Sequence, residues 1–199
     1  FANAHLNLGT ILRDLGRLKE AELSTRKAIE LKPDFANAHL NLGSILSDLG
    51  KLEEAELSTR KAIELKPDFG IAHCNLGSIL SDLGKLEELL TLSESTLGSK
   101  SINQGYKLVA LLRITITKLI QNDFSVTLLN INKTNELINK GAINFIKDKK
   151  LKKYVYNYSK FITSLYPLLD KDNSNSDSNK IPHFGESHCL SFAHQSLSI

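Results

Sequence analysis

Apolar and polar positions in the first half of the chain repeat with a period of 34 residues, and inside each period the apolar positions have helical spacing. In the first unit Ala4, Leu8 and Leu12 are spaced by four residues, which predicts a helix with one apolar face. Gly16 follows in an Asp-Leu-Gly turn, where a residue with positive φ is needed to end the helix. Each unit is therefore expected to begin with one short amphipathic helix.

A second amphipathic helix is predicted in the same unit, from about residue 18 to residue 31. Its inward positions are Leu18, Ala21, Ala28 and Leu31. The helix is expected to end before Lys32-Pro33, because proline cannot continue it. The repeating element is thus a helix hairpin.

The copies of this hairpin keep the same landmark residues at the same offsets. Phe1, Phe35 and Phe69 are equivalent, Asn-Leu-Gly begins at positions 7, 41 and 75, and Asp-Leu-Gly begins at positions 14, 48 and 82. Together with Ala21, Ala28 and Pro33 and their counterparts Ala55, Ala62 and Pro67, this pattern resembles the tetratricopeptide repeat. The resemblance implies an all-α solenoid of helix hairpins. His5, His39 and His73, and Thr25 and Thr59, stand where that family usually has large aromatic residues, so we expect thinner packing there.

The third copy of the repeat is incomplete. It keeps Gly77, Leu80 and Gly84, but Leu89 replaces the small alanine and no proline follows. We therefore expect a repeat array over residues 1–98, with two full repeats and a degenerate third. A short array needs its last apolar face covered, and residues 99–169 are expected to form a helical capping segment.

The capping segment contains three predicted helices. The first spans about 103–121, and its inward positions are Leu108, Leu111, Leu112, Ile116 and Leu119. Asp123 is expected to cap the second, which ends at Gly141 and has an apolar stripe at Phe124, Leu128, Ile131 and Ile138. The third begins near Lys147, with Leu151, Val155, Tyr158, Ile162 and Leu165 on its apolar face.

The C-terminal part of the chain is expected to be a flexible linker over residues 170–180 and the stub of a truncated domain over residues 181–199. The linker prediction follows from an entirely polar composition. The stub contains Gly185-Glu186-Ser187-His188, which is similar to the Gly-Asp-Ser block that opens the SGNH/GDSL hydrolase fold. That resemblance implies a nucleophile role for Ser187, but the base-supplying Asp-x-x-His of the family is missing, and a serine without a base is not activated. The chain as given is therefore predicted not to be an enzyme.

The candidate binding surface is the inner face of the solenoid, which the first helix of each hairpin lines. Asparagines recur there, and an amide both donates and accepts hydrogen bonds, as the backbone of an extended peptide requires. A similar asparagine ladder occurs in the repeat superhelix of O-linked N-acetylglucosamine transferases. The alternative is that these amides only satisfy helix ends or water. The predicted peptide-binding residues are Asn3, Asn7, Thr10, Asn37, Asn41, Ser44, Asn75 and Ser78.

Other binding chemistries find less support in the sequence. Leu6, Leu40 and Cys74 occupy the positions of the lysines with which some repeats of this kind bind a C-terminal carboxylate. The in-phase histidines lie on successive helices about 10 Å apart, too far to share a metal ion, so we expect packing histidines and neither metal nor cofactor. The lysines between 147 and 153 are better explained by the codon usage of an AT-rich, bacterial genome than by a nucleic-acid site, because no aromatic platform accompanies them.

The composition shows that charge is divided unevenly between the two halves of the chain, and it suggests a cellular compartment. Residues 1–98 hold 11 Lys and Arg against 15 Asp and Glu, whereas residues 99–199 hold 14 against 7. No apolar run is long enough to span a membrane. The two cysteines, Cys74 and Cys189, have no ligand or disulfide spacing, so a reducing, cytoplasmic location is the expectation.

These observations predict a protein interaction module, a scaffold fragment that binds a protein or peptide on its concave surface. The alternative is the substrate-recruiting half of a larger enzyme whose hydrolase-like or transferase domain lies outside the chain. The two classes differ in whether a catalytic domain accompanies the repeats.

Overall fold

The computed structural model describes residues 1–121, 123–147, 149, 151–153 and 155–161. The chain divides after Lys85 into two compact units, Phe1–Lys85 and Leu86–Ile199. All regular elements in the described residues are helices, which confirms the predicted all-α class. The predicted linker and stub, and with them Ser187, Ile162 and Leu165, lie outside the described residues.

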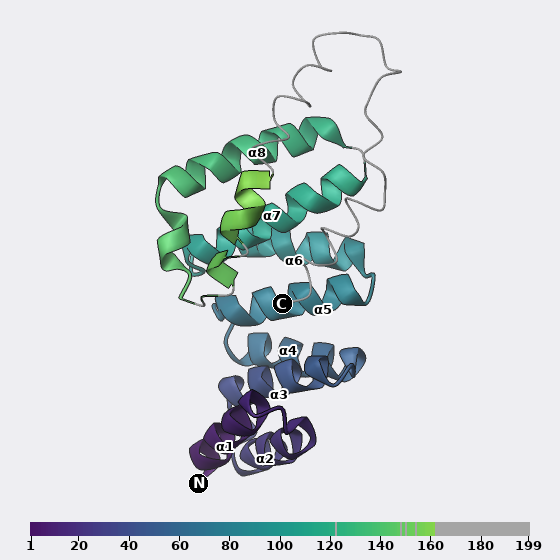
Figure 1. Cartoon of the computed structure of the whole chain (residues 1–199), viewed down its shortest axis with the longest axis vertical. Coiled ribbons are helices and arrows are strands. Elements are labelled where there is room, and N and C mark those ends of the chain that lie inside the picture. The colour runs from purple at the N-terminus through teal and green to yellow at the C-terminus, as the bar shows by residue number, and fades with distance from the viewer. Residues whose placement is uncertain (122, 148, 150, 154, 162–199) are drawn as a thin grey trace. The chain divides into compact units, whose positions relative to one another are not determined.

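The first unit contains five helices among its described residues, and their order follows the 34-residue period (Figure 1). They are α1 (Ala2–Asp14), α2 (Leu18–Leu31), α3 (Ala36–Asp48), α4 (Leu52–Leu65) and α5 (Gly70–Asp82). α1 pairs with α2 and α3 with α4 as hairpins, α2 packs on α3 and α4 on α5, and the first helices contact one another directly. The predicted bounds of the second helix, 18–31, are confirmed.

Glycines turn the chain after α1, α3 and α5, as predicted. Gly16, Gly50 and Gly84 have φ of 73°, 74° and 69°, a left-handed conformation in which a side chain is strained. The backbone N–H of Gly16 donates to the Arg13 carbonyl at 2.9 Å, and Gly50 repeats this bond to Ser47 at 2.9 Å. The same local chemistry therefore makes the same turn in each copy.

Aliphatic side chains form the core between successive hairpins. Ile45 of α3 is fully buried against Leu12 and Ala21 of the first hairpin. One period later Ile79 of α5 is buried against Leu42 and Leu46 of the second hairpin. α3 and α5 thus each use one apolar face to pack against the hairpin before them.

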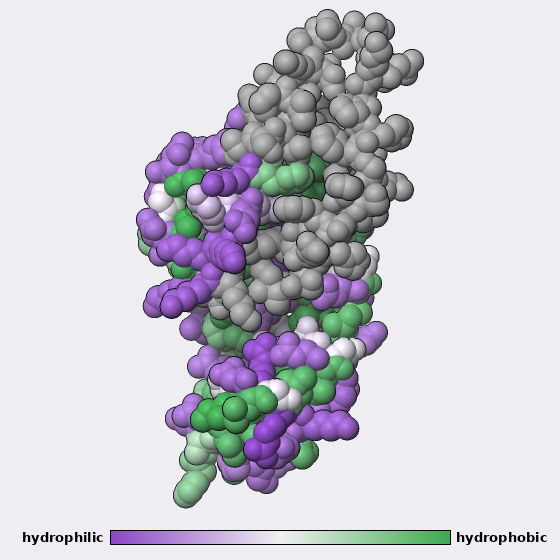
Figure 2. Space-filling view, in the orientation of Figure 1, coloured by the Kyte–Doolittle hydropathy of each residue, from purple (hydrophilic) through white to green (hydrophobic). Residues whose placement is uncertain are grey.

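Within the described residues no hairpin packs against the front of the first one, and one sequence expectation fails there. Leu8 was expected on a buried face but is 47% exposed, whereas its counterparts Leu42 and Leu76 are 5% and 1% exposed. Ile11 is likewise 56% exposed, against 0% for Ile45. Figure 2 shows apolar side chains at the surface of this hairpin. The reason is geometric, because this face becomes buried only where a preceding hairpin packs against it.

A second expectation fails at the end of α2. Leu31 was expected to face inward, but it is 48% exposed. It lies at the last position of the helix, where the chain turns away through Lys32 and Pro33. The loop is held instead by Lys32, whose Nζ lies 5.1 Å from the centre of the Phe35 ring, and Lys66 repeats the contact with Phe69 at 4.9 Å.

The second unit is a helical assembly without the 34-residue repeat. It contains α6 (Leu86–Gly98), α7 (Gln104–Ile120), α8 (Phe124–Asn139), the 3-10 helix η1 (Ala142–Phe145) and helical residues in the range 151–161. α7 is central, since α6, α8 and η1 all pack against it. Its buried positions include the predicted Leu108, Leu111, Leu112 and Ile116, whereas Leu119 is half-buried. Leu128, Ile131, Leu151, Val155 and Tyr158 are buried as predicted.

Side-chain caps begin α7 and α8 in the second unit. The Oδ1 of Asn103 accepts hydrogen bonds from the backbone N–H groups of Gly105 at 3.0 Å and Tyr106 at 3.2 Å, and so begins α7. Asp123 accepts from the N–H of Val126 at 3.3 Å, which confirms the cap predicted for α8. Gly141, with φ of 78°, follows the end of α8.

Candidate functional site

The candidate site is a stripe along the first helix of each hairpin. Positions 3, 7, 10 and 14 are separated by three or four residues, so they lie on one side of α1. The same stripe recurs on α3 and α5. It reads Asn3, Asn7, Thr10 and Asp14, then Asn37, Asn41, Ser44 and Asp48, then Ile71, Asn75, Ser78 and Asp82.

Hydrogen bonds join the stripe of one hairpin to the stripe of the next. The Nδ2 of Asn41 donates to the Thr10 hydroxyl at 2.7 Å, and the Nδ2 of Asn75 donates to the Ser44 hydroxyl at 2.9 Å. Both bonds link residues 31 positions apart. The structure therefore brings four of the predicted site residues together in two equivalent pairs, and these amides also hold successive repeats in register.

The hydroxyl groups set the direction of these amides. Thr10 Oγ1 donates its own proton to the Leu6 carbonyl at 3.1 Å, and Ser44 Oγ donates to the Leu40 carbonyl at 3.1 Å. A hydroxyl has a single proton, so toward the asparagine it acts as an acceptor and must be met by the amide NH₂. The side-chain oxygens of Asn41 and Asn75 are thereby placed on the other branch of the amide, away from the hydroxyl.

The remaining predicted residues lie at the surface. Asn3, Asn7 and Asn37 are exposed and make no side-chain hydrogen bond within the described part of the chain. Ser78 donates to the Cys74 carbonyl at 3.3 Å, just as Thr10 and Ser44 donate to the carbonyl four residues before them. The stripe therefore combines two bonded amides, Asn41 and Asn75, with three exposed ones, Asn3, Asn7 and Asn37.

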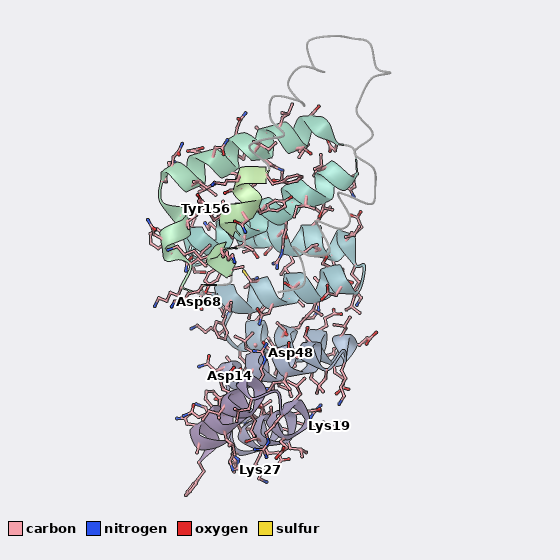
Figure 3. All side chains as sticks on the ribbon, in the orientation of Figure 1. Asp14, Lys19, Lys27, Asp48, Asp68 and Tyr156 are labelled. Atoms are coloured by element: carbon pink, nitrogen blue, oxygen red, sulfur yellow. The ribbon has the colours of Figure 1, made fainter. Side chains whose placement is uncertain are left out.

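Carboxylates end the stripe, and the sequence interpretation did not single them out. Asp48 pairs with Arg13 of the preceding hairpin at 2.6 Å. Asp14, the residue after Arg13, is exposed. Figure 3 labels both aspartates. The helices that carry the stripe hold three aspartates and one arginine and no lysine. The recurrence of these aspartates every 34 residues could have identified them from the sequence.

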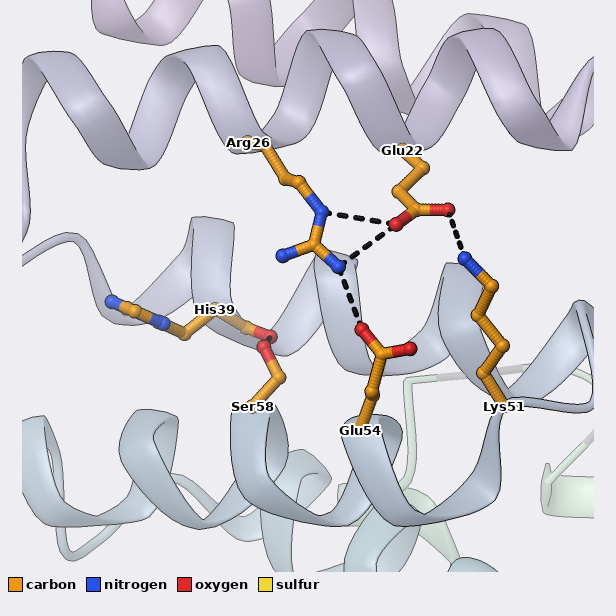
Figure 4. Close-up of polar contacts among 6 residues, drawn as sticks. All are labelled: Glu22, Arg26, His39, Lys51, Glu54 and Ser58. Carbon is orange, nitrogen blue, oxygen red and sulfur yellow. Dashed lines mark hydrogen bonds and ion pairs between the residues drawn. The ribbon is translucent and has the colours of Figure 1, made fainter.

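A second set of polar contacts joins the hairpins on their second helices (Figure 4). Glu22 pairs with Arg26 at 2.8 Å and with Lys51 of the next hairpin at 3.0 Å. Arg26 also reaches Glu54 of the next hairpin at 2.9 Å. Glu56 repeats the arrangement with Arg60 at 2.8 Å and Lys85 at 2.8 Å.

These carboxylates are the most shielded charges of the first unit. The side chains of Glu22 and Glu56 are 13% and 10% exposed. Burial by itself would raise the pKa of Glu22, but the hydrogen bonds from Lys51 and Arg26 outweigh it and lower the pKa below its ordinary value. The pKa of Glu56 is lowered in the same way, against burial, by Lys85 and Arg60. Both groups are structural ion pairs, since each cation is already matched.

The in-phase histidines hold loops. The Nε2 of His39 lies 2.8 Å from the Pro33 carbonyl, and His73 repeats this contact with the Pro67 carbonyl at 2.9 Å. The backbone oxygen of His39 in turn accepts from Ser58 at 2.9 Å, which ties the two helices of that hairpin together (Figure 4). No group of three metal-ligating side chains occurs in the part of the chain that was described.

Among the described residues, none of the helices combines the length and the apolar character that crossing a membrane requires.

Two family models match the first half of the chain. The tetratricopeptide repeat model matches residues 36–69, and a second TPR repeat model matches residues 9–50. The helix hairpins of this region are therefore tetratricopeptide repeats, as their landmarks predicted. Neither match extends to Ser187. No curated protein matches the sequence.

Solved structures share the fold. The chain is 23% identical to the protein of a MamA crystal structure, with a TM-score of 0.64, over 71% of this chain and 80% of that one. YrrB, described as a TPR protein with an unusual peptide-binding site, is 16% identical with a TM-score of 0.59, over 88% and 93% of the chains. PilF of Pseudomonas aeruginosa is 17% identical with a TM-score of 0.60, over 98% and 89%. At these identities the likeness concerns the fold.

Proposed function

We propose that this chain is a protein interaction module whose first helices bind an extended peptide segment of a partner. The observation that carries the proposal is the asparagine ladder, Asn7, Asn41 and Asn75, at one repeated position. Two of its amides are held by a neighbouring hydroxyl through one N–H only, so each keeps an oxygen and a second N–H for a ligand.

Peptide binding agrees with the regular spacing of the exposed amides. Amides at a regular spacing suit a backbone, whose own donors and acceptors recur along an extended chain. YrrB, which shares the fold, is described as having an unusual peptide-binding site. The surrounding contact residues of the proposal are Asn3, Thr10, Asn37, Ser44 and Ser78.

The proposal places the chain among scaffolds and not among enzymes or nucleic-acid-binding proteins, and it includes the cytoplasmic location expected from two cysteines without disulfide spacing. Glu22 and Glu56, the shielded carboxylates, are consumed by ion pairs, so neither is available as a general base. The alternative, a recruiting half of a larger enzyme, uses the same surface and would add a catalytic domain in the parent protein.

Selection from a displayed library of short random peptides tests the proposal. Peptides recovered with the native chain should bind it measurably and should lose about tenfold or more in affinity to the Asn41→Ala/Asn75→Ala variant, since about 1.4 kcal/mol separates such affinities. The control variant is Lys27→Ala/Lys61→Ala, which changes exposed side chains of the second helices. Circular dichroism must show equal helicity for both variants. Failure to enrich any peptide, or equal affinity for both variants, would contradict the proposal.

A further inference from the structure

The hydrogen bonds of the ladder give it a direction, and this direction restricts the chemistry of the partner. Thr10 and Ser44 each donate to the carbonyl four residues earlier, so each can only accept from the amide above it. Asn41 and Asn75 must therefore both turn their NH₂ groups toward the preceding hairpin. An asparagine that turned the other way would set two acceptors against each other.

The groups left for a ligand are weighted toward acceptors. Each oriented amide retains a side-chain oxygen, which offers two lone pairs, and only one N–H. Neither oxygen has a hydrogen-bond partner among the described residues, and the ladder residues are not fully buried. The oxygens of successive repeats hence form a column of acceptors with one orientation.

The charges on the same helices have the matching sign. The three aspartates Asp14, Asp48 and Asp82 follow the ladder on α1, α3 and α5, and Arg13 is the single basic residue of these helices. Arg13 is already paired with Asp48 at 2.6 Å. Asp14 is exposed and makes no ion pair within the described part of the chain, so its charge favours a cationic ligand and disfavours an acidic one.

We propose that the ladder binds a basic, donor-rich extended segment, with backbone N–H groups on the amide oxygens of Asn41 and Asn75 and a lysine or arginine side chain beside Asp14. Thr10 and Ser44 also act as positioning residues, because their hydroxyl groups fix the direction of the two amides. The inference rests on the proposed function, since it names the partner class of the same surface.

Three fluorescent peptides of equal length test the partner class, with serine alternating with lysine, glutamate or glutamine. We expect the lysine peptide to bind most tightly at about 0.05 M salt and to weaken as screening increases. Tighter or equal binding of the glutamate or glutamine peptide would overturn the inference while leaving peptide binding itself in place. Absence of binding by all three, together with no peptide enriched from the displayed library, would instead reject the proposed function.

A matched pair of variants separates the stripe from general charge attraction. Asp14→Asn should weaken binding of the lysine peptide by about fivefold or more, because a unit charge at contact in water contributes about 1 kcal/mol. Glu30→Gln removes the same net charge from an exposed position of the second helix and should leave the affinity unchanged. Equal losses in both variants would show non-specific attraction and would overturn the assignment.

The positioning role has a readout that needs no ligand. Replacing Thr10 by valine removes the acceptor, so the side-chain NH₂ resonances of Asn41 should exchange faster with water and narrow toward those of a mobile amide. Thr10→Ser keeps the hydroxyl and should preserve the native resonances. Unchanged Asn41 resonances in the valine variant would show that the hydroxyl does not orient the amide.

Discussion

Gly43 and Thr59 fit against each other where the two helices of the second hairpin cross. A Cβ atom added to Gly43 would lie 2.2 Å from the Thr59 hydroxyl oxygen, and 3.2 Å from the Ala55 carbonyl. Thr59 is fully buried and donates to that same carbonyl at 2.8 Å, so it cannot move aside easily. Threonine in place of a large aromatic residue therefore does not leave this crossing loosely packed.

Gly43→Ala should accordingly destabilise the first unit by about 1–3 kcal/mol, the usual cost of overpacking. Chemical denaturation followed by circular dichroism measures the loss. Adding Thr59→Ala should recover part of it, because the second change removes the atom that the new methyl group meets. Gly98→Ala is the control, since its Cβ would meet nothing within 4 Å. Equal stability of the Gly43 variant and the native chain would contradict the close fit.

The hairpins were predictable because their signals are local. Gly16 and Pro33 mark the ends of two helices by conformational limits that act within a few residues. Asp123 caps the helix that follows it by accepting from an N–H only three residues away. The same holds for the repeat, whose period is visible without knowledge of any contact.

Contacts between hairpins were less predictable, because the pattern marks a face and not what covers it. Leu8 and Leu42 are equivalent in sequence, yet one is 47% and the other 5% exposed. The bond from Asn41 to Thr10 joins residues 31 positions apart, which requires the stacking geometry of two helices. The sequence thus marked both residues as site candidates but not that one holds the other.

The ion pairs of Glu22 and Glu56 predict an acid-sensitive stability. Their pKa values are lowered from an ordinary value of 4.5, so the folded state binds the proton less readily than the unfolded state does. Their contribution is present above the unfolded pKa and is lost as pH falls through the folded pKa. We expect Glu22→Gln/Glu56→Gln to lower the free energy of unfolding by about 1–2 kcal/mol near pH 7. This loss is smaller than for fully buried ion pairs, because solvent screens the exposed partner cations.

The measurement is urea unfolding of the native chain and this variant at several pH values. The difference between them should shrink as the pH is lowered below the ordinary glutamate range. Glu30→Gln/Glu64→Gln is the matched control, because those carboxylates are 64% and 68% exposed. A difference that stays constant with pH would argue against a charged role for Glu22 and Glu56.

The Asn103 cap predicts a change confined to the second unit. Asn103→Ala leaves the N–H groups of Gly105 and Tyr106 without their acceptor and should destabilise α7 by about 1 kcal/mol. Hydrogen exchange should accelerate at these two amides, whereas the α1–α5 amides keep their native rates. The control is Gln104→Ala, which retains the cap. Acceleration spread equally over both units would show that the effect is not local to the helix start.

Ile11 and Ile45 occupy the same position of successive hairpins and provide a comparison in which sequence context is nearly constant. Ile45 is fully buried between hairpins, so Ile45→Ala should cost about 2–5 kcal/mol through lost burial and a residual cavity. Ile11 is 56% exposed, and Ile11→Ala should change stability by no more than about 0.5 kcal/mol. Urea unfolding and hydrogen exchange of α3 measure both variants under one condition. Because the two substitutions remove the same atoms from the same helical position, any large difference between them reports the packing of one hairpin on the next. Similar losses for both would mean that Ile11 is covered in solution and would contradict the exposed face of the first hairpin.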